Sequence, residues 1–214
     1  MSAKPATTRP LPPTFQLKFP PSLEPYNLPS RAWIAANDKH WDGLATGALV
    51  FSDDAEGSSS SSRRILLLQR AAHDSMPNLW ETPGGAADDD DASLLIACAR
   101  ELWEEAGLEA VDVVRVVSEG EGQEPGSVFT NRTGTVVFCR FAFEVRVRPG
   151  GEVRIDPEEH QDFVWATEEE VKAGRVGGKE IPVTNGQMMR LILDGFRRRA
   201  EEDVEGGREI VVGR

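Results

Sequence analysis

Apolar residues occur along this chain in short continuous runs separated by polar stretches. The runs at 44–51 and 64–70 are nearly continuous, which is typical of buried strands. We expect these two to form an antiparallel pair across the serine-rich polar loop 53–62, which we expect to be flexible. Further strands are expected at 111–117, 136–147 and 162–165. The glycine-rich polar loop 119–134 is of the kind that borders a site.

Helical periodicity marks three other segments. From 93 to 106 the apolar residues recur on one face, with Ser93 or Asp91 as the N-terminal cap and Gly107 as the C-terminal stop. A short helix is expected at 168–173 and a longer one at about 185–202. The residues expected to face the core are Leu95, Cys98, Leu102 and Ala106 on the first helix, and Met188, Leu191, Ile192 and Phe196 on the last.

Strands on both sides of a central helix, with another helix at the end, indicate an α/β layered fold with a mixed sheet. The 214 residues fit one domain, which we place at 14–203. Residues 14–41 lack a regular pattern but carry several aromatic side chains, so we expect this arm to pack on the domain. We expect a disordered tail at 1–13, which is rich in proline and threonine, and a frayed C-terminal tail at 204–214.

Bulk composition narrows the class of protein. The chain is 39% hydrophobic and 28% charged, and no apolar run approaches the ~20 residues that a membrane-spanning helix needs. The N-terminus has no apolar segment, so we expect no secretory leader. Two cysteines fit a reducing compartment, and we expect a cytoplasmic protein, with the nucleus left open. The net charge of −12 disfavours a nucleic-acid polymer as partner and favours a small anionic metabolite bridged by metal ions.

Three carboxylates on the central helix carry the clearest chemical signal. Glu101, Glu104 and Glu105 fall within about 100° of one another on a helix, just behind the glycine pair Gly84-Gly85. Such like charges repel unless a cation lies among them. Oxygen ligands suit the hard cations Mg²⁺ or Mn²⁺, which bind phosphates. The segment therefore predicts a metal platform for phosphate chemistry, against the plainer reading of a solvated helix face.

The sequence Trp80-Glu-Thr-Pro-Gly-Gly85, followed by Arg100-Glu-Leu-Trp-Glu-Glu-Ala-Gly-Leu108, resembles the signature of Nudix hydrolases, GX₅EX₇REUXEEXGU with U apolar. The resemblance covers roughly 14–203 and implies a Nudix-type α/β/α sandwich. There is one departure, because the first glutamate of this box falls at Ala92 and the spacing from Gly85 to Arg100 is one residue longer. Asp90 or Asp91 is a candidate to supply the missing acid from the longer loop.

The resemblance implies roles for the residues of the box. Glu101, Glu104 and Glu105 would hold one to three Mg²⁺ ions and take part in catalysis. Arg100 would orient the box loop by hydrogen bonds to a carboxylate, and the backbone at Gly84 and Gly85 would approach a phosphate. An extra metal-binding or catalytic acid is expected in the loop before the strand at 162–165, with Glu159 as first choice, Glu158 behind it, and a surface acidic loop as the alternative.

Candidates for contacts to the substrate lie outside the box. Arg70, at the end of a predicted strand, is a candidate for binding phosphate, with a solvent-facing role as the alternative. Trp33, Trp80 and Phe129 are candidates for stacking on a nucleobase, although core packing is the more ordinary role. His160 is read as a surface or substrate-edge histidine rather than a catalytic base. Cys98, on the apolar stripe of the helix, is read as a buried small hydrophobe.

Taken together, the resemblance implies Mg²⁺-dependent hydrolysis of a nucleoside diphosphate linked to another moiety X. The alternative, which the altered spacing around Ala92 favours, is a Nudix-fold nucleotide-binding or sensor domain without hydrolysis. Retention of all three helix glutamates counts against that alternative. The identity of X is not legible in the sequence, and a homodimer is left open.

Overall fold

The computed structural model describes residues 12–52, 63–131 and 133–209, with side chains described up to residue 202. The expectations for the tail up to residue 11, for loop 53–62 and for residues 210–214 concern positions outside these ranges. Within the described ranges, no helix combines the length and the apolar character needed to cross a bilayer.

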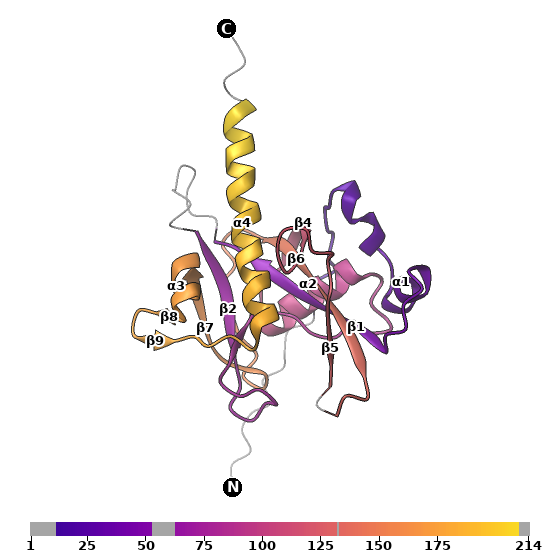
Figure 1. Cartoon of the computed structure of the whole chain (residues 1–214), viewed down its shortest axis with the longest axis horizontal. Helices are drawn as coiled ribbons and strands as arrows, with labels where there is room; N and C mark the ends of the chain where they lie inside the picture. Colours follow the sequence, from indigo (N-terminus) through magenta and orange to yellow (C-terminus); the bar gives the residue numbers. More distant parts are fainter. Residues whose placement is uncertain (1–11, 53–62, 132, 210–214) are drawn as a thin grey trace.

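Two sheets form the middle of the molecule (Figure 1). In the larger sheet, β1 (Gly43–Val50) pairs in parallel with β6 (Val137–Val147), and β4 (Ala110–Val117) and β5 (Ser127–Thr130) pair antiparallel with β6. In the smaller sheet, β2 (Arg64–Arg70) lies between β3 (Trp80–Glu81) and β7 (His160–Thr167). A separate two-stranded ribbon joins β8 (Arg175–Val176) to β9 (Lys179–Glu180).

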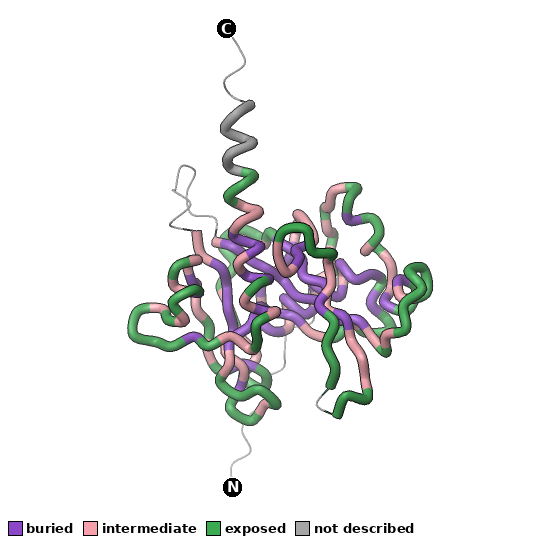
Figure 2. Tube along the Cα trace, in the orientation of Figure 1, coloured by how far each residue is buried: buried purple, intermediate pink, exposed green. Residues whose placement is uncertain are grey.

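Helices cover these sheets from two sides. The helix α2 (Leu94–Ala106) packs on β1 and β6 in one hydrophobic cluster, whereas α4 (Gly186–Glu209) packs on the other face with α3 (Glu168–Ala173) in a second cluster. Figure 2 shows the buried chain concentrated between these layers. The expected α/β/α sandwich with a central mixed sheet is therefore confirmed.

The ends of α2 follow from local chemistry. Ser93, rather than Asp91, is the N-terminal cap, since its hydroxyl accepts the backbone N–H of Ile96 at 3.2 Å. Gly107 ends the helix in the left-handed conformation, with φ of 68°. The expected helix at 168–173 is found with the same bounds, and α4 continues to Glu209, beyond the expected end near Glu202. Its C-terminal half projects from the sheets in Figure 1.

The predicted hairpin between the first two apolar runs is wrong. β1 and β2 belong to different sheets, and the two runs share one isolated antiparallel bridge, Phe51 to Ile65. Seven of the eight residues of β1 are buried, a pattern typical of a parallel strand covered on both faces, and its partner is β6. The prediction failed because two strands that are neighbours in the sequence need not pair when a long loop joins them.

Two segments that the sequence reading left irregular contain regular structure. The loop 119–134 holds β5, which its short length and glycine-rich flanks hid. The arm at 14–41 holds a 3₁₀ helix, η1 (Pro21–Tyr26), and the helix α1 (Ser30–Ala36). The expectation that this arm packs on the domain is confirmed, since Leu23 and Trp33 lie in the hydrophobic cluster of α2.

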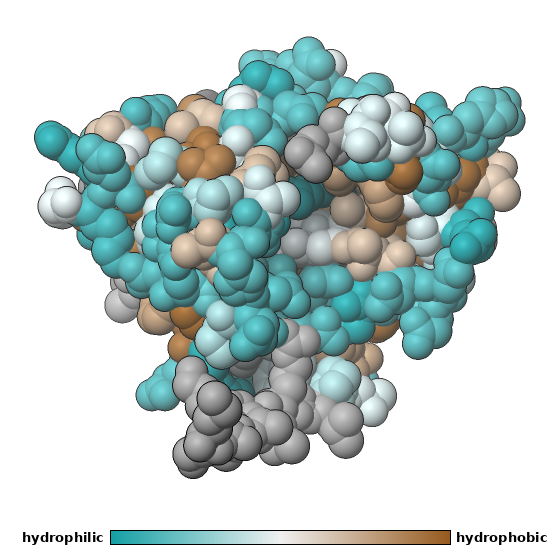
Figure 3. Space-filling view, turned by 90° about the horizontal axis from the view of Figure 1, so that it is seen from below, coloured by the Kyte–Doolittle hydropathy of each residue, from teal (hydrophilic) through white to brown (hydrophobic). Residues whose placement is uncertain are grey.

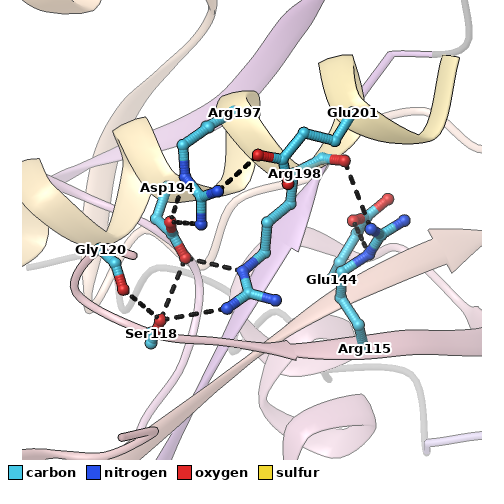
Figure 4. Close-up of polar contacts among 8 residues, drawn as sticks. All are labelled: Arg115, Ser118, Gly120, Glu144, Asp194, Arg197, Arg198 and Glu201. Carbon is cyan, nitrogen blue, oxygen red and sulfur yellow. Dashed lines mark hydrogen bonds and ion pairs between the residues drawn. The ribbon is translucent and has the colours of Figure 1, made fainter. Parts of the chain in front are cut away.

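A buried polar network fastens α4 to β4 and β6 (Figure 4). Asp194 accepts hydrogen bonds from Arg197 at 2.6 Å, from Arg198 at 2.8 Å and from the hydroxyl of Ser118 at 3.2 Å. Glu144 on β6 pairs with Arg115 of β4 at 2.9 Å. It also pairs with Arg199 of α4 at 3.1 Å. The network fixes the helix whose beginning borders the cavity described below.

Candidate active site

The glycine pair brings the loop after β3 into contact with the acids of α2. The backbone N–H of Gly84 donates to Oε2 of Glu105 at 2.6 Å. A Cβ at Gly84, where φ is 148°, would lie 2.2 Å from the carbonyl oxygen of Thr46, and one at Gly85 would lie 2.6 Å from Oε2 of Glu101. Gly84 therefore requires glycine for conformation as well as for close approach, whereas Gly85 favours glycine through its close approach to the Glu101 carboxylate.

Arg100 ties this loop to the helix with its whole guanidinium group. Nε and Nη2 donate to the two carboxylate oxygens of Asp91 at 3.0 and 2.9 Å, and Nη2 also donates to the carbonyl of Ala86. Nη1 donates to Glu101 at 2.8 Å and to Glu104 at 3.1 Å. The expected orienting role thus has a geometric basis, since one planar group fixes both the loop and two of the acids.

Of the two candidates to replace the glutamate missing at Ala92, Asp91 is the one that contacts Arg100. Its side chain is buried and holds Arg100, whereas Asp90 is exposed. Asp91 also accepts the backbone N–H of Asp88 at 2.8 Å, so it closes the longer loop on itself. This turn accommodates the extra residue between Gly85 and Arg100, and Asp91 still binds Arg100.

The acids of α2 are under-neutralised in the folded protein. Burial raises the pKa of Glu101 to about 7, and the charges of Glu104 and Glu159 act in the same direction against Arg100. Burial also raises the pKa of Glu105 well above its usual value, despite the N–H of Gly84. Repulsion between buried carboxylates is the condition that a cation relieves.

The loop before β7 brings a fourth acid to this cluster. The backbone N–H of Asp156 donates to the carbonyl of Glu105 at 3.2 Å, and the N–H of Ala71 donates to the carbonyl of Glu159 at 2.8 Å. The loop is therefore tied both to α2 and to the end of β2. Carboxylate oxygens of Glu105 and Glu159 and one ring nitrogen of His160 lie within 4.8 Å of one another. Glu158 is exposed, and its carbonyl contacts His73 instead.

Two buried residues lie beside the acids: His160, which the sequence left as a weak candidate, and Glu81, which the sequence did not single out. His160 is 2% exposed, so the reading of a surface histidine is wrong. Glu81, in the lead-in to the box, is also buried, and its Oε1 lies 3.9 Å from Nε2 of His160. Burial raises the pKa of Glu81, but His160, Arg140 and Arg70 outweigh it and leave the pKa lowered. The position of Glu81 directly after Trp80 in the lead-in to the box was the available signal, but it does not show what faces the side chain.

Arg70 is held by acids rather than open to solvent. It pairs with Glu81 and with Asp74, the latter at 2.5 Å. The guanidinium of Arg70 therefore braces Glu81. Its contacts support neither a phosphate-binding role nor a solvent-facing one.

A cavity of about 210 Å³ lies beside Glu81, between β5 and the beginning of α4. Its lining combines apolar and amide side chains, including Phe129, Asn185, Gln187 and Met188. The guanidinium carbon of Arg140 lies 6.0 Å from the centre of the Phe129 ring. Figure 3, which views the molecule from below, shows this end hollowed, with apolar side chains inside a hydrophilic rim. Glu81 joins this cavity to the acid cluster.

The three aromatic candidates for stacking on a nucleobase differ in how far their side chains are exposed. Trp80 is fully buried and Trp33 is 6% exposed, stacked against Trp41 in the arm, so neither presents a face to a ligand. Phe129 is 37% exposed and stacks on Phe138 from behind. The prediction for Cys98 is confirmed, since it is an unpaired thiol buried in the core.

Comparisons with known proteins agree with this geometry. A family model described as NUDIX domain matches residues 42–184. A search of curated proteins finds no match. The fold is similar to that of the MutT protein from Methanosarcina mazei Go1, with 21% identity over 74% of this chain and 95% of that one and a TM-score of 0.52.

Two further solved structures show the same likeness. The NUDIX domain of Shewanella oneidensis NrtR, complexed with ADP ribose, is 18% identical over 79% of this chain and 99% of that chain, with a TM-score of 0.53. The Nudix hydrolase RenU from M. smegmatis is 18% identical over 78% and 88%, with a TM-score of 0.52. At these identities the structures establish a shared fold.

Proposed function

The chain belongs to the Nudix hydrolase family, and we propose that it performs Mg²⁺-dependent hydrolysis of the diphosphate bond in a nucleoside diphosphate linked to another moiety X. Water adds across the P–O–P bridge and leaves two phosphate monoesters. The observation that carries the proposal is the pair of buried, under-neutralised acids Glu101 and Glu105 behind the Gly84-Gly85 loop.

The donor set fits a hard divalent cation. Glu101, Glu104, Glu105 and Glu159 offer carboxylate oxygens, the ligand type that Mg²⁺ prefers. The raised pKa of both Glu101 and Glu105 marks a place where positive charge is lacking. When bound, Mg²⁺ would neutralise the diphosphate and favour ionisation of water.

The other residues position the substrate and the proton acceptor. Glu159 is the exposed acid of the cluster, so it is placed to accept a proton from the attacking water. Arg100 holds the loop that carries the glycines at its fixed distance from the helix. The N–H of Gly84 is taken by Glu105, so the glycines support the site by allowing close packing.

The cavity beside Glu81 is the proposed site of a planar ring such as a nucleobase. Phe129 offers a partly exposed face for stacking, and the side chains of Asn185 and Gln187 offer amide groups at its edge. Phe129→Leu should raise KM by about 10-fold, the equivalent of losing one stacking contact, with little change in kcat. An unchanged KM would remove the ring from this cavity.

The test is turnover of a substrate panel. The protein is incubated with Mg²⁺ and ADP-ribose, dinucleotide cofactors or damaged nucleoside triphosphates, and the release of nucleoside monophosphate or phosphate is measured. Glu104→Gln should abolish release, whereas the control Glu169→Gln, at an exposed position of α3, should retain it. Turnover that survives chelation of metal would contradict the proposal.

The same panel decides the alternative of a sensor domain without hydrolysis. Tight binding without turnover across the panel would favour it. The altered spacing at Ala92 was the main support for the sensor alternative. The contact of Asp91 with Arg100 weakens that support. The proposed compartment is the cytoplasm, supported by two buried unpaired cysteines, Cys98 and Cys139.

A further inference from the structure

His160 faces the acid cluster from the beginning of β7. Only 2% of the residue is exposed, and one of its ring nitrogens lies within 4.8 Å of a carboxylate oxygen of Glu105 and of Glu159. The imidazole therefore adds a nitrogen to a cluster that is otherwise made of oxygens.

The ring also has an unsatisfied polar atom. Nδ1 of His160 is buried and has no hydrogen-bond partner in the described part of the chain. Leaving a buried polar atom without a partner is costly, and natural structures contain few such atoms. A ligand that accepts the lone pair of an imidazole nitrogen would remove that cost.

The backbone holds the ring in place. The N–H of His160 donates to the carbonyl of Asp156 at 2.8 Å, and the N–H of Asp156 donates to the carbonyl of Glu105 at 3.2 Å. One short chain of hydrogen bonds thus connects the histidine to the helix that carries the nearest acid. The main chain that carries His160 is therefore fixed relative to Glu105.

We propose that Glu105, Glu159 and His160 form a mixed nitrogen–oxygen site for a transition-metal dication such as Mn²⁺. The site shares Glu105 and Glu159 with the proposed magnesium cluster, so its part in catalysis rests on the proposed function, whereas the binding of metal does not. It differs from a site of carboxylates alone in selectivity, because an imidazole nitrogen favours first-row transition metals over Mg²⁺.

A carboxylate lies near Nε2 of His160. Histidines that bind metals usually donate the other ring N–H to a carboxylate or a carbonyl, which fixes the tautomer. Glu81, braced by Arg70, has its Oε1 3.9 Å from Nε2 of His160. Glu81 is thus a positioning residue for the imidazole.

The chain has three histidines, which allows a direct test that leaves His160 intact. The double variant His40→Gln/His73→Gln, both at exposed positions, retains His160 as its single histidine. This protein is prepared with ¹⁵N-labelled histidine, loaded with Mn²⁺ alone, and studied by electron spin echo envelope modulation. The expected result is nitrogen coupling to Mn²⁺ that changes with the label. No coupling sensitive to the label would overturn the proposal.

Affinity gives the second arm. His160→Gln should weaken binding of Mn²⁺ by at least about tenfold while changing binding of Mg²⁺ by less than about threefold, because a nitrogen ligand contributes chiefly to the transition metal. The control His73→Gln should leave both affinities unchanged, and circular dichroism establishes that each variant folds. Equal losses for both metals, or no loss for Mn²⁺, would overturn the proposal.

Activity separates this inference from the proposed function. Turnover with Mg²⁺ in a protein whose Mn²⁺ shows no coupling to histidine would refute the mixed site and leave the hydrolase intact. Coupling of Mn²⁺ to histidine without turnover of any diphosphate would refute the hydrolase and leave the mixed site intact.

Discussion

Two helices of this molecule bury carboxylates, and they do so in opposite ways. On α4, Asp194 is matched by Arg197 and Arg198, which outweigh the effect of burial and lower its pKa. On α2, burial dominates, and the pKa values of Glu101 and Glu105 are raised. The first arrangement is complete within the protein, whereas the second lacks positive charge. A raised pKa alone does not distinguish the two regions, because burial also raises the pKa of Glu144 between Arg115 and Arg199. What supports the proposed metal site is that several acids share one arginine around Glu101 and Glu105.

The number of arginines near the acids differs between the two helices. The network around α4 sets Arg115, Arg197 and Arg198 against acids (Figure 4), and Arg199 joins them by pairing with Glu144. On α2 a single guanidinium, that of Arg100, serves Asp91, Glu101 and Glu104 together. Asp194 thus has two arginine partners to itself, whereas three acids share Arg100.

The largest effect that would test this contrast is expected at Glu105. Glu105→Gln should lower kcat by at least about 100-fold, because the variant loses a charged ligand and its share of catalysis. The metal-free variant should be at least as stable as the wild type, since a neutral amide suits a buried site whose carboxyl has a raised pKa. Steady-state kinetics and thermal unfolding in chelator measure both. Full activity, or a marked loss of stability, would erase the contrast with α4.

On α4 the same kind of change should act on stability alone. Asp194→Asn should lower the free energy of unfolding by about 3 kcal/mol, because the buried carboxylate loses its charge-assisted hydrogen bonds to Arg197 and Arg198, which are partly buried. Glu201→Gln, which removes an exposed partner of Arg197, should change it by less than about 0.5 kcal/mol. Chemical denaturation at neutral pH measures the difference.

The effect of Asp194 has a definite dependence on pH. Its pKa is lowered in the folded state, so its contribution is present above the unfolded pKa and is lost as pH falls through the folded pKa. The gap between wild type and Asp194→Asn should therefore close on acidification. A gap that widens towards low pH would contradict the pairing.

Glu101 should show the opposite dependence in metal-free protein. Its pKa rises from 4.5 to about 7 on folding, so ionisation penalises the folded state, and the penalty grows as pH rises through this interval. At about pH 8 the metal-free variant Glu101→Gln should exceed wild type in stability by up to about 3 kcal/mol, and by almost nothing at about pH 4. Denaturation in chelator across this range gives the slope. Added Mg²⁺ should shrink the gap.

The smallest effect is expected at the loop that Arg100 holds. Asp91→Asn should cost about 2 kcal/mol of stability, because a charged hydrogen-bonded partner of Arg100 is lost. Asp90→Asn, one residue away and exposed, should change stability by less than about 0.5 kcal/mol. Equal effects at the two positions would mean that neither acid stands in for the glutamate missing at Ala92.

What the sequence could predict was local. The bounds and caps of α2, the grouping of Glu101, Glu104 and Glu105, and the bounds of α3 follow from periodicity and capping within a few residues. The choice between Asp90 and Asp91 stayed open because adjacent acids differ only in which one turns towards Arg100.

What the sequence could not predict depends on distant segments. The pairing of β1 with β6 joins strands that lie far apart in the sequence, with β2 to β5 between them. The meeting of Glu81 with His160 depends on β3 and β7 both lying against β2. Burial of His160 follows from that meeting, so a pattern read along the chain assigned it to the surface.

The shape of one guanidinium group limits how this region can change. Arg100 points at once to a loop carbonyl, to a loop acid and to two acids of its own helix. An ammonium group on a flexible stem offers no such planar fork, so lysine at position 100 would preserve the charge and forfeit the geometry. Aspartate at position 91 contacts Arg100 where the family signature has a glutamate, so the acid can differ. Arg100 itself has no equivalent substitute.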